Sequence, residues 1–455
     1  MKTVWDKLDE TEKENLTSFN EAYRQFLSRA KTEREFTSES EKLAKEAGFV
    51  SLKEVEKLEP GMKVYEINRG KNIMLFVMGR QPVKAGMNIL GAHIDSPRLD
   101  IKQKPLYEKD DLALLDTHYY GGIKKYQWTC RPMALHGVVC KKDGSVVPVV
   151  IGEDPNDPVI GVTEILVHLA AEQMKKTAAE AVEGENLDLL VGSIARKDAK
   201  EDAVKANILS LLKEKYDIEE DDFLSAELEC VPAGEARDFG FDRSMIMGYG
   251  HDDKVCAYTS LRAILDEKDV PERTSCCILV DKEEIGSVGA TGMQSRFFED
   301  VTARMLDLQG DTRIVDLNDA LQNSRMLSSD VSAAVDPLYE SVFDMKNAAF
   351  LGQGICYNKY TGARGKSGSN DANAEYFAKV RRVMDDNHVM FQTCELGAVD
   401  KGGGGTIAYI LANLNMDVVD AGIAVENMHS PAEIVSKADV YEAYRAYQAF
   451  LKDMD

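Results

Sequence analysis

The sequence predicts an α/β fold that is interrupted by a smaller β-rich unit. Apolar runs typical of strands buried on both faces, such as residues 87–92 and 275–280, occur with helical patterns towards both ends of the chain. Residues from about 100 to 240 instead carry short alternating strands. A chain of 455 residues is also too long for one ordinary core. We therefore expect a larger domain built from residues 1–100 and 241–455, and an inserted domain of residues 101–240.

The elements of the first part are expected to be helices followed by strands. Residues 4–47 carry apolar side chains at three- and four-residue spacings, which favours packing helices. Two neighbouring strands follow at 63–67 and 73–78. The buried strand that begins at residue 87 runs into His93 and Asp95, so a polar pair closes it.

The middle and the end of the chain differ in pattern. In the insertion we expect strands at 123–128, 134–139 and 145–151, and helical stretches at 163–178 and 199–222. After residue 240 we expect a helix at 253–267, the strand at 275–280, α/β segments at 312–317 and 324–335, a helix at 407–412 after the glycines 402–405, a last core strand at 418–425 and a closing helix at 437–452.

The composition is that of an ordinary soluble globular chain. Hydrophobic residues make up 44% and charged residues 29% of the sequence, and the net charge is -23. This charge repels nucleic acid and anionic membrane surfaces, so we expect neither as a partner. The N-terminus lacks the apolar segment of a signal peptide, and no run approaches the roughly 18 apolar residues of a spanning helix. We therefore expect a cytoplasmic location.

The cysteine pattern excludes a disulfide scaffold. The 8 cysteines contain no CxxC pair, and no two of them have the spacing of a metal site. We interpret them as reduced core thiols.

Polar residues follow the apolar strands at several places. They are His93 with Asp95, Asp252 with Asp253, Glu283 with Glu284, Asp330, and His429. Ligands of open α/β sheets bind beyond the carboxyl ends of strands, where these residues fall. Mixed nitrogen and oxygen donors suit zinc, manganese or cobalt, and a paired site with one bridging carboxylate leaves positions open for water and substrate. The set therefore fits a paired metal site.

Each piece alone has a plainer interpretation. Asp252 and Asp253 could cap a helix, Asp330 could hold a turn, and the glycines at 402–405 could be a hinge. Their occurrence together in one chain favours the site. His93 and Asp95 lie two residues apart on one face of an extended segment, so Asp95 can accept a hydrogen bond from the imidazole and fix its tautomer.

The motifs resemble those of a known family. Residues 91–97, 252–254, 281–287, 328–330 and 429–431 resemble, in order and context, the motifs of the M18 metallo-aminopeptidases, the aspartyl aminopeptidase family, and residues 360–367 resemble its bacterial branch. The related M42 peptidases share the metal motifs but are shorter. The resemblance covers nearly the whole chain. It implies an α/β metallopeptidase catalytic domain, with a central mixed sheet flanked by helices, and an inserted β-rich dimerisation domain.

The resemblance also implies roles for the candidate residues. His93 and Asp330 would hold one divalent ion, Glu284 and His429 the other, and Asp252 would bridge them; zinc is the first choice, with cobalt and manganese as alternatives. Glu283 would be the general base that takes a proton from the bridging water and delivers it to the leaving amine. The substrates would be peptides with a free N-terminus.

Substrate contacts and assembly rest on the same resemblance. His168 matches a family histidine that reaches a neighbouring subunit's active site, which implies a homo-oligomer, a dodecamer built from dimers. Lys359, Arg364 and Lys366 are candidate cations for an acidic N-terminal side chain, with ordinary surface residues as the alternative. Ala333 stands where aspartate-selective relatives carry a histidine, so a preference for Asp or Glu stays open.

Two other classes of protein remain open from the sequence. A related metal hydrolase, such as a deacetylase or carboxypeptidase, would tolerate a blocked N-terminus. A non-catalytic metal-binding assembly scaffold would bind metal without turnover, although it would not need Glu283 for ligation.

Overall fold

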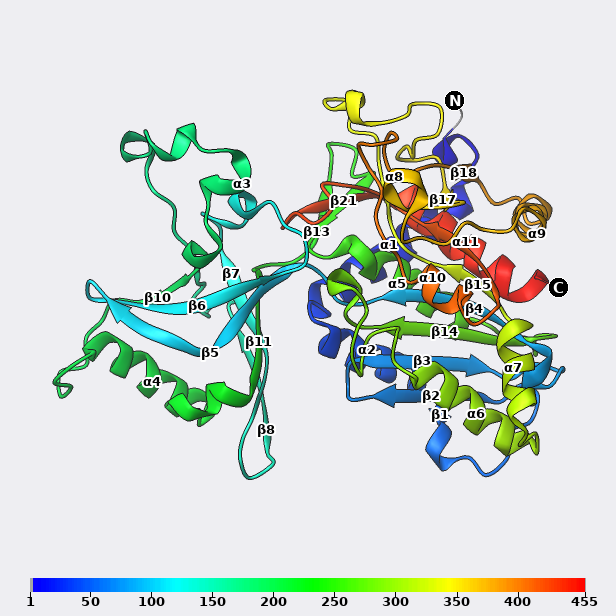
Figure 1. Ribbon diagram of the computed structural model, residues 1–455, viewed down its shortest axis with the longest axis horizontal. Helices are drawn as coiled ribbons and strands as arrows, with labels where there is room; N and C mark the ends of the chain where they lie inside the picture. Colours follow the sequence, from blue (N-terminus) through cyan, green and yellow to red (C-terminus); the bar gives the residue numbers. More distant parts are fainter. Residues whose placement is uncertain (1–2, 455) are drawn as a thin grey trace. The chain divides into compact units, whose positions relative to one another are not determined.

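The computed structural model describes residues 3–454 and consists of two compact units (Figure 1). The first comprises the described residues up to Asp95, residues Ala236–Met428 and those from Glu433 onward. The second comprises Ser96–Glu235 together with the short segment His429–Ala432. The insertion expected from the sequence, residues 101–240, therefore lies a few residues later in the chain than the second unit, and residues 429–432 were expected in the larger domain.

A nine-stranded sheet forms the centre of the first unit. In spatial order its strands are β1 (Val50–Ser51), β2 (Lys63–Asn68), β3 (Asn72–Val77), β14 (Thr274–Val280), β4 (Met87–His93), β15 (Arg325–Ser328), β19 (Asp417–Gly422), β17 (Ile355–Asn358) and β18 (Phe391–Thr393). The four central strands β14, β4, β15 and β19 are parallel, while β3 and β17 run antiparallel to their inner neighbours. The sheet is therefore mixed, as the family resemblance implies.

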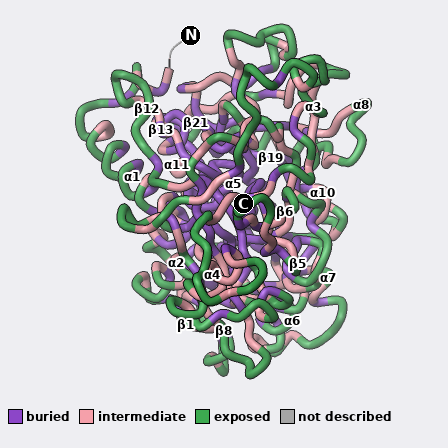
Figure 2. Tube along the Cα trace, turned by 90° about the vertical axis from the view of Figure 1, so that its left-hand side faces the viewer, coloured by how far each residue is buried: buried purple, intermediate pink, exposed green. Residues whose placement is uncertain are grey.

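Helices cover both faces of this sheet. One face carries α1 (Glu10–Arg29), α2 (Glu33–Glu46), α5 (His251–Leu265), α9 (Ala374–Asp386) and α11 (Lys437–Asp453), and the other carries α6 (Phe297–Gln309), α7 (Ile314–Gln322) and α10 (Ala408–Ala412). Successive residues of β14 alternate between the two cores: Cys277 packs with the first group and Cys276 with the second. Helices α5 and α11 are largely buried (Figure 2).

Capping explains why residues 4–47 form separate helices. The side chain of Asp9 accepts a hydrogen bond from the backbone N of Glu12 at 2.8 Å and starts α1. The side chain of Thr32 accepts one from the backbone N of Glu35 at 3.2 Å and starts α2. A short 3₁₀ turn, η1 (Val4–Asp6), precedes both.

A five-stranded sheet accompanies the large one in the first unit. Its strands are β12 (Arg237–Phe239), β13 (Met245–Gly248), β21 (Glu433–Ser436), β20 (Ala424–Glu426) and β16 (Ser332–Ala333). The expected strand at 418–425 is thus divided between β19 and β20, and the segment at 324–335 between β15 and β16. A Cβ added to Gly422 would lie 1.7 Å from the carbonyl oxygen of Asp330, so the two dividing points pack backbone against backbone.

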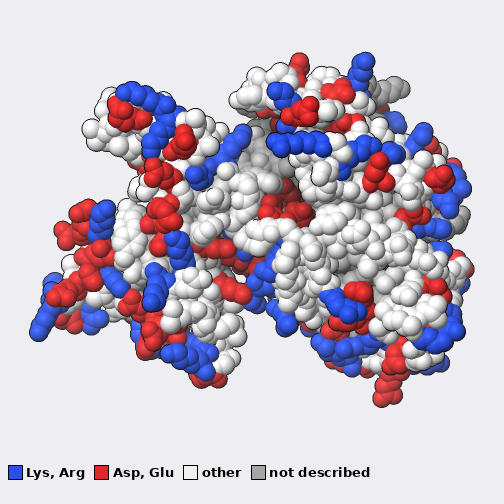
Figure 3. All heavy atoms as spheres, viewed as in Figure 1, with Lys and Arg blue, Asp and Glu red and all other residues white. Residues whose placement is uncertain are grey.

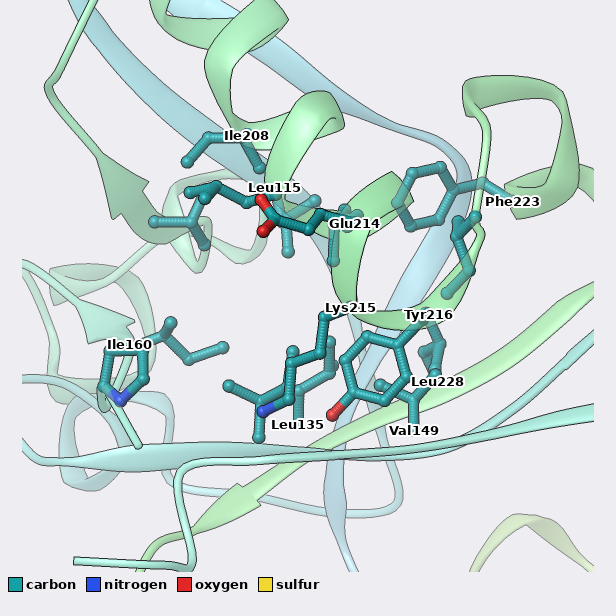
Figure 4. Close-up of a pocket in the computed structure, with 16 residues that line it drawn as sticks. Leu115, Leu135, Val149, Ile160, Ile208, Glu214, Lys215, Tyr216, Phe223 and Leu228 are labelled. Carbon is teal, nitrogen blue, oxygen red and sulfur yellow. The ribbon is translucent and has the colours of Figure 1, made fainter. Parts of the chain in front are cut away.

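The second unit contains a seven-stranded antiparallel sheet. Its strands are β8 (Val146–Ile151), β7 (Met133–Cys140), β11 (Ala226–Pro232), β5 (Arg98–Lys109), β6 (Leu112–Tyr120), β10 (Leu189–Gly192) and β9 (Gly161–Val162). Its longer helix, α4 (Ala203–Tyr216), accompanies a one-turn helix, α3 (Ala178–Ala181). An apolar cavity of about 630 Å³ lies between α4 and the sheet; Leu115, Leu135, Ile208 and Phe223 are among its lining residues (Figure 4).

Several expectations for the insertion are wrong. The strand expected at 123–128 is the 3₁₀ turn η4 (Lys125–Trp128), whose Trp128 is fully buried as a single anchor. The helix expected at 163–178 is replaced by two 3₁₀ turns, η5 (Val167–Leu169) and η6 (Gln173–Lys175). The larger apolar side chains of this segment are exposed, and Val167, for example, is 72% exposed. An apolar stripe stabilises a helix only when it is buried.

Other differences are smaller. The helix expected at 199–222 is α4, which ends at the left-handed Asp217, followed by the 3₁₀ segment η8 (Glu220–Ser225). Cys130 is exposed and Cys140 partly exposed, so these two are not core thiols, while the other six cysteines are buried and free. Within residues 3–454, no helix combines the length and the apolar character needed to cross a membrane. Acidic and basic side chains are interspersed on the face drawn in Figure 3.

Candidate metal centre

Polar side chains gather at one edge of the nine-stranded sheet. His93 ends β4, Asp330 follows β15, and Glu283 and Glu284 form the turn η9 (Glu283–Ile285) after β14. These three strands are parallel neighbours, so their carboxyl ends meet at the same edge. The start of α5 brings its acidic residues to β4, because the backbone N of His93 donates to Oδ2 of Asp253 at 3.2 Å.

Two groups of side chains have the geometry of a metal site. In the described residues, potential ligand atoms lie within 4.8 Å of one another in the group His93, Asp253 and Asp330, and in the group His93, Asp252 and Glu284. His93 belongs to both, and its Nε2 lies 3.2 Å from Oδ1 of Asp252. His93, Asp252, Asp253 and Asp330 are all at most 8% exposed. The structure therefore brings together four of the five ligands expected from the sequence.

The carboxylate of Asp95 holds two parts of this edge together. Its Oδ1 accepts a hydrogen bond from the backbone N of Glu283 at 3.1 Å, and its Oδ2 accepts one from that of Glu284 at 3.2 Å. Nδ1 of His93 lies 3.2 Å from Oδ1 of Asp95 and 3.1 Å from its carbonyl oxygen. Since both neighbours of Nδ1 are acceptors, this nitrogen carries a proton, which leaves Nε2 as the nitrogen that can bind an ion when the ion displaces its proton.

Glu283 lies at the margin of the cluster. Its Oε2 is 3.9 Å from Nε2 of His93, and its side chain is 17% exposed, compared with 5% for Asp252. The left-handed Lys282 and Gly286 frame the turn that presents it. Glu283 is thus close to the buried cluster, and its side chain is partly exposed to solvent.

The electrostatics of the cluster call for a cation. Burial raises the pKa of Asp253 and of Asp330 well above the usual range, and neighbouring carboxylates raise the pKa of Asp330 further. Burial disfavours a charged His93, but its hydrogen bonds to Asp252 and Asp95 outweigh this and raise its pKa. Oδ1 of Asp253 is buried without a hydrogen-bond partner within residues 3–454. A divalent cation would relieve both the repulsion and this unmet acceptor, and a set of imidazole and carboxylate donors suits zinc.

Asp253 is the residue that sequence reasoning left out of the ligand set. The Asp252–Asp253 pair was visible, but two adjacent aspartates have the same chemistry, and only Asp252 was assigned to the ions. In the structure Asp253 joins the group of Asp330, while Asp252 joins that of Glu284.

The remaining candidates are not members of these two groups. His429 belongs to the segment that clusters with the second unit, where its Nδ1 is 2.7 Å from the carbonyl oxygen of Gly122, and neither group found in the described residues includes it. His168 is exposed on η5 of the second unit. Lys359 and Lys366 share a counterion, with their Nζ atoms 2.8 Å and 2.9 Å from the two carboxylate oxygens of Asp371.

The chain is similar to known proteins along nearly its whole length. Residues 26–451 match the family model described as aminopeptidase I zinc metalloprotease (M18). The chain is 56% identical over 457 residues to the probable M18 family aminopeptidase 1 of Clostridium acetobutylicum. This alignment covers 99% of this chain and 98% of that protein. The crystal structure of the M18 aminopeptidase of Thermotoga maritima superposes with a TM-score of 0.96 at 45% identity, covering 100% of this chain and 99% of that one. The S. cerevisiae mApe1 dodecamer, at 19% identity and a TM-score of 0.77 with 97% of each chain covered, shares the fold.

The matches run through both units and include the motifs that build the buried cluster. The enzyme classes left open by the sequence are thereby reduced to one, a metal-dependent hydrolase of peptide bonds. The chain belongs to the M18 family of zinc metallo-aminopeptidases.

Proposed function

We propose that this aminopeptidase hydrolyses the first peptide bond of its substrates at a two-metal site in which Glu283 is the general base. The observation that carries the proposal is the buried cluster around His93, with two overlapping ligand groups and a more exposed glutamate beside them. The two groups together gather four carboxylates beside one histidine, and two divalent ions balance that negative charge better than one.

His93, Asp252, Glu284 and Asp330 would hold the two ions, with Asp252 between them. Asp253 is an additional candidate on the side of Asp330. His429 is proposed as a further ligand, on the basis of the family motif that it shares. When bound, zinc supplies Lewis acidity, which makes water a usable nucleophile near neutral pH.

Glu283 would move the proton. A general base must lie next to the nucleophile and remain within reach of the leaving group. The position of Glu283 at the margin of the cluster meets both conditions, because it is near His93 but partly exposed. It would accept a proton from the attacking water and give it to the amine of the departing peptide.

Asp95 would act through other residues. Its hydrogen bonds to the backbone of Glu283 and Glu284 hold the base and one ligand at a fixed distance from β4. Its contact with Nδ1 of His93 selects the tautomer whose Nε2 can bind a metal.

Substrate choice and assembly are the finer parts of the proposal. An acidic N-terminal side chain bound by Lys359 and Lys366 would compete with Asp371, which already forms an ion pair with each of these lysines. Asp and Glu are therefore one class to be tested against neutral residues. We also propose a homo-oligomer, with the S. cerevisiae mApe1 dodecamer as the pattern, in which His168 of one subunit contacts the substrate of another.

The test is a panel of aminoacyl chromogenic amides with free and with acetylated N-termini. The enzyme is stripped of metal, reloaded with zinc, cobalt or manganese, and assayed for initial rates, while elemental analysis gives the number of ions per chain. We expect two ions per chain and turnover of the free amines alone. Cleavage of the acetylated set would support a deacetylase, and full loading without any turnover would support a scaffold.

A further inference from the structure

Two buried cysteines of the first unit lie side by side, outside the metal cluster. Cys356 is on β17, and Cys394 directly follows the parallel strand β18. The backbone N of Cys394 donates to the carbonyl oxygen of Tyr357 at 3.0 Å, so the pairing of the two strands extends to this residue. Both thiols belong to one small apolar cluster, whose other buried members are Ala334, Ala349 and Ala424.

The surroundings of Cys394 favour its thiolate. A hydrogen bond from the Cys356 thiol lowers the pKa of Cys394, its hydrogen-bond contacts with Ser332 and Asn358 act in the same direction, and burial opposes them. Its Sγ lies 3.5 Å from Oγ of Ser332 and 3.6 Å from Oδ1 of Asn358. The buried thiols of Cys230 and Cys277 show the opposite behaviour, because burial alone raises their pKa. Since the thiolate is the reactive form, Cys394 differs from these inert cysteines.

Cys394 is buried but borders a pocket of the surface. It lines a surface pocket of about 490 Å³ together with Tyr357, Lys359, Arg381 and Glu395. Cys356 is not among the residues that line this pocket and lies behind Cys394 in the cluster. Of the two cysteines, Cys394 is therefore the one beside the pocket, and Cys356 is next to it in the cluster.

The pair is connected to the metal cluster through one short segment. Ser332, the hydroxyl partner of Cys394, is two residues after Asp330. The backbone N of Ser332 donates to the carbonyl oxygen of Ile423 at 2.9 Å, next to the close contact between Gly422 and Asp330. A change at the sulfur of Cys394 thus acts on a tightly packed segment that carries a candidate ligand.

We propose that Cys394 and Cys356 form an oxidation-sensitive pair that lowers the activity of the enzyme in the presence of hydrogen peroxide. The Cys394 thiolate attacks the peroxide O–O bond and becomes a sulfenic acid, while the other peroxide oxygen takes up a proton and leaves as water. The Cys356 thiol then attacks this sulfur, its proton goes to the departing hydroxyl group, and a disulfide and a second water form. The two thiols lose two electrons in total, and the peroxide gains them. Formation of the disulfide removes the thiol from Ser332 and displaces Asp330.

The test uses the full-length zinc-loaded enzyme and hydrogen peroxide as the probe. Samples are taken during oxidation, denatured in the presence of an alkylating agent that blocks free thiols, digested, and analysed by mass spectrometry for disulfide-linked peptides. Activity is measured in parallel. We expect the Cys356–Cys394 link to form before any modification of Cys230 or Cys277. Activity is expected to fall by roughly 10- to 100-fold, because an error of about 1 Å in an active site has an effect of this size. A thiol reductant is expected to restore it.

Variants separate the two steps. In Cys356→Ser, the sulfenic acid of Cys394 has no resolving thiol and is expected to react with a dimedone probe. In Cys394→Ser, neither the link nor the reversible loss of activity should occur, while Cys130→Ser, at the exposed thiol, is the matched control and should behave as wild type.

Three results would overturn the proposal. They are a wild-type enzyme whose Cys356 and Cys394 stay reduced while other thiols react, an equal loss of activity in Cys394→Ser, and a link that forms without any loss of activity. The mapping of the link requires neither a variant nor peptidase activity, so its outcome is independent of the proposed reaction.

Discussion

The carboxyl edge of the nine-stranded sheet and the region beneath α4 differ in how tightly their residues are packed. At the edge, charged groups are buried and the backbone is packed so tightly that a Cβ at Gly422 would lie 1.7 Å from the carbonyl oxygen of Asp330. Beneath α4, apolar side chains leave a cavity of about 630 Å³ (Figure 4). Spare volume is tolerated where mostly apolar residues meet, and the packing is tight where carboxylates must be held at fixed distances.

This difference follows from what each region requires. A metal site depends on the positions of its ligands to within roughly 0.5 Å, which loose packing does not provide. Apolar contacts are non-directional, so a helix can lie over a sheet with some latitude. If this comparison is correct, substitutions at the edge should affect activity, metal affinity and packing, whereas those at the cavity should have small effects on stability alone.

The largest effect is expected for Glu283→Gln. The amide is nearly the same size but does not accept a proton, so kcat/KM should fall by roughly 10²- to 10⁴-fold. The metal content, measured by elemental analysis, should not change. Glu284→Gln is the matched variant and should lose metal. An equal loss of metal in both would mean that the roles of the two glutamates are exchanged.

Asp95→Asn should weaken metal binding by roughly 10- to 100-fold, the range for residues that orient a ligand. The amide has one acceptor oxygen where the carboxylate has two, so it would lose one of the backbone hydrogen bonds from Glu283 and Glu284. Competition with a chelator measures the affinity. Asp143→Asn, in an exposed turn of the second unit, is the control and should not alter it. Unchanged affinity in Asp95→Asn would show that the edge does not depend on this carboxylate.

Gly422→Ala tests the tight packing directly. The new methyl group would force β19 away from Asp330, and overpacking of this kind costs about 1–3 kcal/mol of stability. Thermal denaturation and zinc affinity should both decrease. Gly405→Ala is the control, because its Cβ would meet its nearest neighbour only at 3.9 Å. Equal melting temperatures for the two variants would contradict the close contact.

The smallest effect is expected at the cavity. Val149 lines it, and Val149→Ile adds one buried methylene, which should stabilise the protein by up to about 0.8 kcal/mol. The same change at Val419, a fully buried residue of β19, has no free volume and should destabilise by about 1–3 kcal/mol. Chemical denaturation of both variants gives the comparison. A destabilised Val149→Ile would mean that the cavity closes in solution.

The sequence predicts the first unit better than the second, for a physical reason. Strands β4 and β14 are buried along their whole length, so their apolar runs are unambiguous, and the polar residues after them mark the site. Residues 163–178 have an equally clear helical pattern, but most of their large apolar side chains are exposed. Periodicity alone does not reveal whether the apolar face of a predicted helix will be buried.

Within the site, the limits of prediction are set by proximity in space. His93, Glu284 and Asp330 follow from strand ends, whereas the distinct positions of Asp252 and Asp253 depend on the backbone at the start of α5. Cys356 and Cys394 were interpreted only as core thiols, because their relation arises from the pairing of β17 with β18 and leaves no local signature in the sequence.

The bonds of Asp95 have a consequence for how the enzyme matures. They join β4 to the turn after β14 through protein atoms alone, so the spacing of His93, Glu283 and Glu284 is established when the chain folds. A newly made subunit can therefore be complete in shape before it receives any zinc. Its activation then depends on the supply of the ion in its surroundings, and we expect that the ion can be removed and restored without unfolding the subunit.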